Sequence, residues 1–250
     1  MVKLKTEEEI DIMVQGGKKL RIVVAKLIPS VKPGVSTEEI DKKAEELIKK
    51  QGAEPSFQKV RGYFWSTCLS INEQVVHTPP SKRIIKEGDV FTLDIGVYFR
   101  GFHTDFATTF IVGKKKDKET EKFLDVGRQT LKKALEKVKM GNFLGEVSET
   151  IESEITKHGL FVLKELTGHG IGRELHEDPT IPGFLPRPKE KTVKVRPGLV
   201  VAIEVIYSKG TDAIVYEKDS DWSLVTDDQS LSACFEHTIA IRGRNSIILT

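Results

Sequence analysis

The fold that this sequence predicts rests on two stretches: EGDVFTLD at residues 87–94 and PGLVVAIE at residues 197–204. Each contains a glycine turn, continues as a β-rich apolar run and ends on a carboxylate. An ionised carboxylate is costly to bury without a counter-charge, so a buried strand ending on an acid is unusual. Finding this pattern twice indicates that the chain repeats itself.

The segments around these stretches repeat as well. Capping-box spacing at Thr6/Glu9 and at Ser36/Glu39 predicts the starts of two helices, and Gly52 ends the second. A further pair of helices follows the same order and ends at Gly159. We therefore predict one α+β catalytic domain over residues 1–250. It consists of two pseudo-symmetric α-α-β halves, about 1–113 and 114–250, with the active site between them.

Composition excludes several classes of protein. The net charge of +2 over 250 residues is too small for a nucleic-acid footprint. The basic run at residues 114–118 is interpreted as a solvated loop, with a docking patch for an anionic surface such as ribosomal RNA as the alternative. Cys68 and Cys234 form no disulfide framework, and we expect no signal peptide and no membrane span. The expected location is the cytoplasm.

The segment between Asp94 and Asp105 predicts a hairpin that turns near residues 99–101. A two-residue turn in the expected register places Tyr98 opposite Gly101 and Asp94 opposite Asp105, while a bulge at Gly101 would shift the register by one. Two opposed carboxylates repel unless one holds a proton or a cation lies between them. Surface aspartates are the alternative, but the apolar run before Asp94 favours burial.

Three further residues are candidates for the same site as these two aspartates. His169 stands between two glycines in TGHGIGRELHEDP at residues 167–179, whose spacing matches no phosphate-binding loop. Glu204 and Glu236 both lie in apolar runs that predict buried strands. Four carboxylates balance the charge of two divalent cations, and an oxygen-rich ligand set favours manganese, iron or cobalt over a thiolate zinc site.

These residues resemble a known set. Asp94, Asp105, His169, Glu204 and Glu236 are similar to the metal ligands of type I methionine aminopeptidases, which have the creatinase-like "pita-bread" fold. The resemblance covers nearly the whole chain, from VKPGVST at residue 31 to SACFEHTIAI ending at residue 241. It includes CLSINEQVVH at residues 68–77, and no long insertion separates His176 from Glu204, which resembles type I rather than type II.

The resemblance implies two divalent ions, drawn from manganese, iron, cobalt and zinc. It implies that Asp94 binds one ion, that His169 and Glu204 bind the other, and that Asp105 and Glu236 bridge both. A bridging water would attack the scissile carbonyl, and Glu204 would shuttle its proton. The remaining implied residues act on the substrate: His77 and His176 hold the peptide and stabilise the tetrahedral intermediate, and Tyr63, Cys68 and Trp222 line the methionine pocket.

The implied activity is removal of the initiator methionine from nascent proteins when the second residue is small. The expected partners are N-terminal peptides and, as an open question, the ribosome; we expect a monomer, no membrane and no specific nucleic-acid binding. Leu175, Phe57 and Val60 depart from the usual pocket residues. HGIGRELHEDP and DIGVYFRGFHTD lean toward Xaa-Pro peptidases, so an Xaa-Pro aminopeptidase of the same fold is the alternative enzyme. A non-enzymatic pita-bread binding protein is the alternative of another class.

Overall fold

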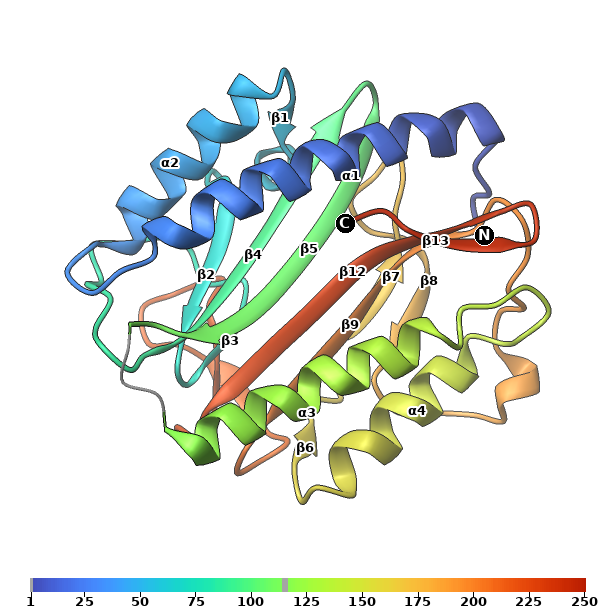
Figure 1. The fold of residues 1–250 in the computed structure, drawn as a ribbon. Coiled ribbons are helices and arrows are strands. Elements are labelled where there is room, and N and C mark those ends of the chain that lie inside the picture. The colour runs from blue at the N-terminus through green and yellow to red at the C-terminus, as the bar shows by residue number, and fades with distance from the viewer. Residues whose placement is uncertain (1, 114–116) are drawn as a thin grey trace.

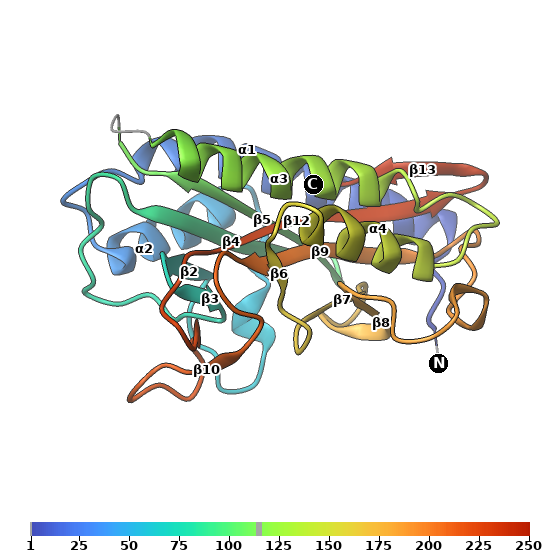
Figure 2. The same cartoon turned by 90° about the horizontal axis from the view of Figure 1, so that it is seen from below.

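A computed structural model describes residues 2–113 and 117–250. These described residues form one layer of four helices against a broad antiparallel sheet, with smaller strands and loops on the opposite face (Figures 1 and 2). The helices are α1 (Glu7–Leu27), α2 (Thr37–Lys50), α3 (Lys118–Leu135) and α4 (Gly145–Thr156), with 3₁₀ turns at Ile28–Ser30, Phe57–Lys59 and Lys189–Lys191. None of these helices is long and apolar enough to span a membrane. The basic run 114–118 lies partly outside the described residues.

The large sheet has ten strands in the described part of the chain. Its main path runs β1-β4-β5-β12-β9-β7-β8, while β2 pairs with β4, β6 with β9 and β13 with β12. A second sheet has the order β10-β11-β3. The bounds are β1 Glu54–Pro55, β2 Thr67–Ile71, β3 Gln74–Val76, β4 Val90–Phe99, β5 Phe102–Ile111, β6 Phe161–Val162, β7 Thr167–Gly170, β8 Glu177–Pro182, β9 Val200–Ser208, β10 Ile214–Tyr216, β11 Leu224–Thr226, β12 Ser232–Arg242 and β13 Asn245–Ile248.

Both predicted capping boxes are present. The Thr6 hydroxyl accepts from the Glu9 amide while the Glu9 carboxylate accepts from the Thr6 amide, and Ser36 and Glu39 make the same reciprocal pair. These bonds satisfy amides that a helix leaves unpaired at its first turn, so α1 and α2 begin where the sequence predicts.

Glycines at equivalent points of the two predicted halves adopt matching conformations. Gly34 and Gly141 have φ of 91° and 95°, and Gly88 and Gly198 have φ of 86° and 85°. Non-glycine residues seldom adopt these left-handed values. Each half places two helices before a pair of long strands, and the strands β5 and β12 meet at the centre of the sheet (Figure 1). The α+β prediction is confirmed, while the division at residue 113 stays a prediction.

The predicted register of the β4–β5 hairpin is wrong by two residues. Asp94 lies opposite Ala107, and Asp105 lies opposite Gly96. The turn consists of Arg100 and Gly101, with φ of 50° and 92°. A two-residue hairpin turn of this type needs positive φ at both positions, and glycine adopts such a value without strain. The two aspartates still share one face of the sheet, but they are diagonal neighbours, at roughly 7–8 Å rather than about 5 Å.

The long strands also continue beyond their acids. Asp94 and Glu204 were expected at the ends of their strands, yet each is the fifth residue of its strand, β4 or β9. Strand pairing extends to Phe99 and Ser208. The three residues after Asp94 and the four after Glu204 are buried. The acids therefore lie in the middle of the sheet, at equivalent places in the two halves.

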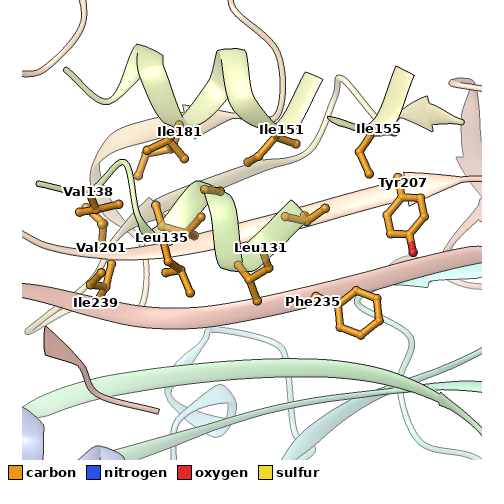
Figure 3. Close-up of a cluster of buried hydrophobic side chains, with 14 of the residues drawn as sticks. Leu131, Leu135, Val138, Ile151, Ile155, Ile181, Val201, Tyr207, Phe235 and Ile239 are labelled. Atoms are coloured by element: carbon orange, nitrogen blue, oxygen red, sulfur yellow. The ribbon is translucent and has the colours of Figure 1, made fainter. Parts of the chain in front are cut away.

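Alternation along each strand separates a helix-facing core from a polar face. Val201 and Tyr207 of β9, together with Phe235 and Ile239 of β12, point toward α3 and α4 and pack with Leu131 and other apolar side chains (Figure 3). A second cluster joins α1 and α2 to β2 and β4. Because side chains alternate with a period of two, the neighbouring residues, including Glu204 and Glu236, point to the opposite face.

Adjacent glycines of α1 provide a stability test. A Cβ on Gly17 would come within 2.7 Å of the Leu249 carbonyl carbon, whereas the nearest atom to a Cβ on Gly16 is 3.6 Å away. Gly17→Ala is expected to lower the free energy of unfolding by about 1–3 kcal/mol through overpacking. Gly16→Ala is expected to raise it by up to about 1 kcal/mol through helix propensity. Urea denaturation measures both, and equal effects would contradict the close approach of Leu249.

Candidate metal centre and active site

The predicted ligands stand on two adjacent rows that cross the large sheet. The first row consists of Asp94, Ala107, Glu236 and Glu204, which are opposed in turn across β4, β5, β12 and β9. The second row consists of Gly96, Asp105, Thr238, Ala202 and His169. In that row two hydrogen bonds of 2.9 Å join Asp105 to Thr238: the Asp105 amide donates to the threonine hydroxyl, and the hydroxyl donates to the Asp105 carbonyl.

Small residues on these rows leave space between the functional side chains. Ala107 separates Asp94 from Glu236, and Ala202 separates Thr238 from His169. The glycines beside His169 are required for close packing, as the sequence predicted: a Cβ on Gly168 would lie 2.6 Å from the Ala202 carbonyl oxygen. A Cβ on Gly170 would lie 2.7 Å from the Asp178 carbonyl carbon.

The side chains of the two rows converge. Atoms of Asp105, His169 and Glu236 that can bind a metal lie within 4.8 Å of one another, and all three residues are buried. His169 Nε2 lies 3.5 Å from the Glu204 carboxylate, and the Nδ1 is 2.9 Å from the Gly170 carbonyl oxygen. Asp94 completes the acidic group from β4. The structure thus brings together all five residues that the sequence singled out as ligands.

Burial and mutual repulsion dominate the electrostatics of this cluster. Burial, followed by the nearby carboxylates, raises the pKa of Asp94, Glu204 and Glu236 well above the usual range. Burial also raises the pKa of Asp105 to about 7 and lowers that of His169 to about 3. His169 is therefore neutral at pH 7, which is the form that binds a metal.

The cluster fits a group of divalent cations. Asp94 Oδ1 and Glu236 Oε1 are buried and have no hydrogen-bond partner among the described residues. No lysine or arginine within residues 2–113 and 117–250 lines the cavity around them. Buried carboxylates without a counter-charge are unfavourable, and oxygen ligands with one imidazole suit manganese, iron or cobalt.

All the predicted site residues line one cavity of about 630 Å³. Glu204 and Glu236 point away from the helix-facing core, so this cavity lies on the face of the sheet opposite the helices. Besides the five predicted ligands, it is lined by the sequence-predicted residues Phe57, Val60, Tyr63, Cys68, His77, Leu175, His176 and Trp222. They come from both halves of the chain. The prediction of a site between the halves agrees with this arrangement.

His77 and His176 differ from His169 in their exposure to solvent. Both are exposed to the cavity, whereas His169 is buried. The ring of His176 makes an edge contact with the His169 ring at 4.4 Å between centroids. His77 has a left-handed φ of 57°. Such strain in a non-glycine residue is concentrated at functional sites, and it is a signal that sequence alone does not give.

An aromatic group forms one wall of the cavity. Tyr63 packs edge-on against Trp222 at 5.1 Å and against Phe57 at 6.4 Å, and its hydroxyl donates to the Thr67 carbonyl oxygen at 2.7 Å. Cys68 lies directly opposite Asp94, so this wall continues to the acidic cluster. The cavity therefore has an apolar part, formed by the aromatic wall, beside the polar part formed by the acidic cluster.

Sequence reasoning missed several cavity residues. Val76, Leu166, Thr167 and Ile206 add further lining, and Glu165 adds an exposed carboxylate. It also missed a buried ion pair beneath His176. Ile206 lies two residues after Glu204 on the same face of β9, so strand alternation was a signal for it. Glu165 and Leu166 lie between β6 and β7, where no periodic pattern marks them.

The fold and the acidic cavity together define a metallopeptidase. The sequence pattern of metallopeptidase family M24 matches residues 11–243, and the chain belongs to that family. The methionine aminopeptidase 1 of Bacillus subtilis is 40% identical over 250 residues, with 100% of this chain and 99% of that protein covered. The methionine aminopeptidase of Clostridium perfringens has the same identity and coverage.

A solved structure agrees with these relatives. The crystal structure of methionine aminopeptidase from Thermotoga maritima matches with a TM-score of 0.95 and 37% identity, covering 100% of this chain and 99% of that one. The family and the pita-bread fold predicted from the sequence are therefore confirmed.

Proposed function

We infer that this protein is a methionine aminopeptidase, which removes the initiator methionine from new polypeptides. The observation that carries the inference is the single cavity that joins the acidic cluster, two accessible histidines and an aromatic wall. Full-length similarity to methionine aminopeptidases supports the same activity. The activity test compares kcat/KM on Met-Ala, Leu-Ala, Met-Lys and Ala-Pro peptides. Faster cleavage of Ala-Pro than of Met-Ala would overturn the assignment in favour of an Xaa-Pro aminopeptidase.

We propose that Asp94, Asp105, His169, Glu204 and Glu236 hold two divalent ions. When bound, such ions supply positive charge that polarises the scissile carbonyl and lowers the pKa of water. Four carboxylates offset the charge of two divalent ions, which supports two ions rather than one. The identity of the ions, ribosome contacts, a monomeric state and action in the cytoplasm stay predictions.

Cation binding is expected to stabilise the chelated protein. At a free concentration one hundred times Kd, a ligand that binds only the folded state adds about 2.7 kcal/mol, which raises Tm by roughly 5–10 °C in a chain of this size. Thermal melting with Mn²⁺ or Co²⁺ measures the shift. Glu236→Gln should lose most of it. Glu165→Gln, which changes an exposed acid in the same cavity, should keep it. An equal shift in both variants would contradict the ligand assignment.

The chain's own residues provide the proton transfer and the orientation of the substrate. Glu204 lines the cavity beside His169, where its carboxylate accepts a proton from the attacking water and returns it to the leaving amine. His77 and His176 reach into the open part of the cavity, where they bind the peptide and donate to the oxygen that becomes negative.

Leu175 is expected to set how strictly the pocket selects methionine. It is buried and lines the cavity together with Tyr63 and Trp222. Hydrophobic pockets discriminate by only about 1–3 kcal/mol per methylene, so the wild type should cleave Met-Ala fastest and norleucine and leucine peptides more slowly. Leu175→Phe adds an aromatic contact for sulfur and should raise the Met-to-Leu ratio of kcat/KM about fivefold. If the ratio did not change, Leu175 would not contribute to the selection of methionine.

A further inference from the structure

His176 lies in a short turn whose shape is set by the backbone. The Ile171 amide donates to the Val200 carbonyl oxygen at 3.2 Å, and the Gly172 amide donates to the Glu174 carbonyl oxygen at 3.1 Å. No hydrogen bond from a described side chain restrains the His176 ring itself. The position of the imidazole in the cavity therefore follows from the conformation of the turn 171–177.

Glu177, the next residue, fixes this turn with both carboxylate oxygens. Oε1 accepts from the Arg173 amide at 2.8 Å and from the Glu174 amide at 3.2 Å, so it closes the turn on the N-terminal side of His176. Oε2 accepts from Lys5 Nζ at 2.6 Å. Both side chains of this ion pair are 1% exposed. A single carboxylate thus links the turn to a residue 172 positions earlier in the chain.

Lys5 is held as firmly as its partner. Its amide donates to the Gly198 carbonyl oxygen at 2.8 Å, and its ammonium also donates to the Lys3 carbonyl oxygen at 3.0 Å. The lysine side chain passes directly over Gly172, where a Cβ would lie 2.7 Å from Nζ. The segment before α1 and the turn therefore interlock, and neither can shift without the other.

A buried ion pair adds little to the stability of the fold, because desolvation of the two charges offsets most of their attraction. Such a pair does fix the positions of its two side chains, because each charge must keep its partner and its hydrogen bonds. A second contact acts in the same place: the Arg173 guanidinium pairs with the Glu9 carboxylate of α1 and lies 5.3 Å from the Phe102 ring centroid. The Lys5–Glu177 and Arg173–Glu9 ion pairs thus hold the turn in one conformation.

We propose that Lys5 is a positioning residue for His176, acting through the Glu177 carboxylate. The proposal rests on the proposed function, since it assigns His176 a part in peptide cleavage. Lys5 does not touch the substrate. Its ammonium holds Glu177, Glu177 holds the turn, and the turn aims the imidazole into the cavity beside His169.

A double-mutant cycle on kcat for a Met-Ala peptide tests this role. Lys5→Met is expected to lower kcat roughly tenfold to a hundredfold, as small displacements of a reacting group do, with metal content unchanged. In a His176→Ala background the same change should cause no further loss, because effects that pass through one residue are not additive. Lys3→Met, on the exposed neighbour of the same segment, is the matched control and should match the wild type in both backgrounds.

Lys5→Met leaves a buried carboxylate unpaired and is open to misfolding, so Lys5→Met/Glu177→Gln is measured alongside it. The amide keeps an oxygen that accepts from the Arg173 amide and carries no charge. This variant should melt as a folded protein and show the same loss of kcat, again absent without His176. If the loss of Lys5 lowered kcat by the same factor in both backgrounds, or did not lower it in an active enzyme, the role of Lys5 would be overturned. The proposed function would not be affected by that result. An inactive wild type with bound metal would overturn the proposed function and this role with it.

Discussion

Replacing Glu204 by glutamine is expected to lower kcat on a Met-Ala peptide by about a thousandfold, within the range that a positioned general base contributes. The amide is nearly the same size and retains one oxygen, but it cannot accept a proton. The carboxylate lies 3.5 Å from His169 Nε2 and belongs to the acidic cluster. The loss should therefore appear in kcat, with a folded protein and a small change in KM.

Metal content decides how the Glu204 result is interpreted. Glu165→Gln is the matched control, because it makes the same chemical change on an exposed acid of the same cavity and should retain wild-type kcat. Full turnover by Glu204→Gln with metal bound would reject its part in proton transfer. A loss of activity in strict proportion to metal content would leave Glu204 as a ligand only.

His77→Ala and His176→Ala are each expected to lower kcat about a hundredfold, as does the loss of one preorganised donor to a developing negative oxygen. Both side chains are exposed within the cavity, outside the buried cluster of Asp105, His169 and Glu236. Metal content should therefore stay at the wild-type level. Single-turnover rates and metal analysis on the same preparations measure the two effects separately.

The matched control for these variants is His158→Ala, a change to an exposed histidine that does not line the cavity. It should leave both kcat and metal content unaltered. If metal content fell in step with activity in either cavity variant, that histidine would be a ligand instead of a substrate-side donor.

Local patterns in the sequence were sufficient to predict the helices and to single out the residues that gather in the cavity. A capping box such as Thr6/Glu9 involves residues three positions apart, so its geometry is contained in the segment itself. A carboxylate such as Glu204 in an apolar run is conspicuous for a similar reason, since burial of an acid needs compensation. The glycines around His169 predicted close packing, and the carbonyl groups of Ala202 and Asp178 lie against them.

The tertiary structure decided the relations between distant segments. The pairing of Asp94 with Ala107 depends on which turn residues adopt left-handed φ, and the Lys5–Glu177 ion pair joins segments that share no sequence pattern. Strand register and buried ion pairs depend on the packing of the whole sheet, whose energy is spread over many long-range contacts. Helix caps and hydrophobic alternation depend on neighbours in the chain. The sequence therefore determined which residues to expect in the cavity, and only the folded chain determined how they face one another.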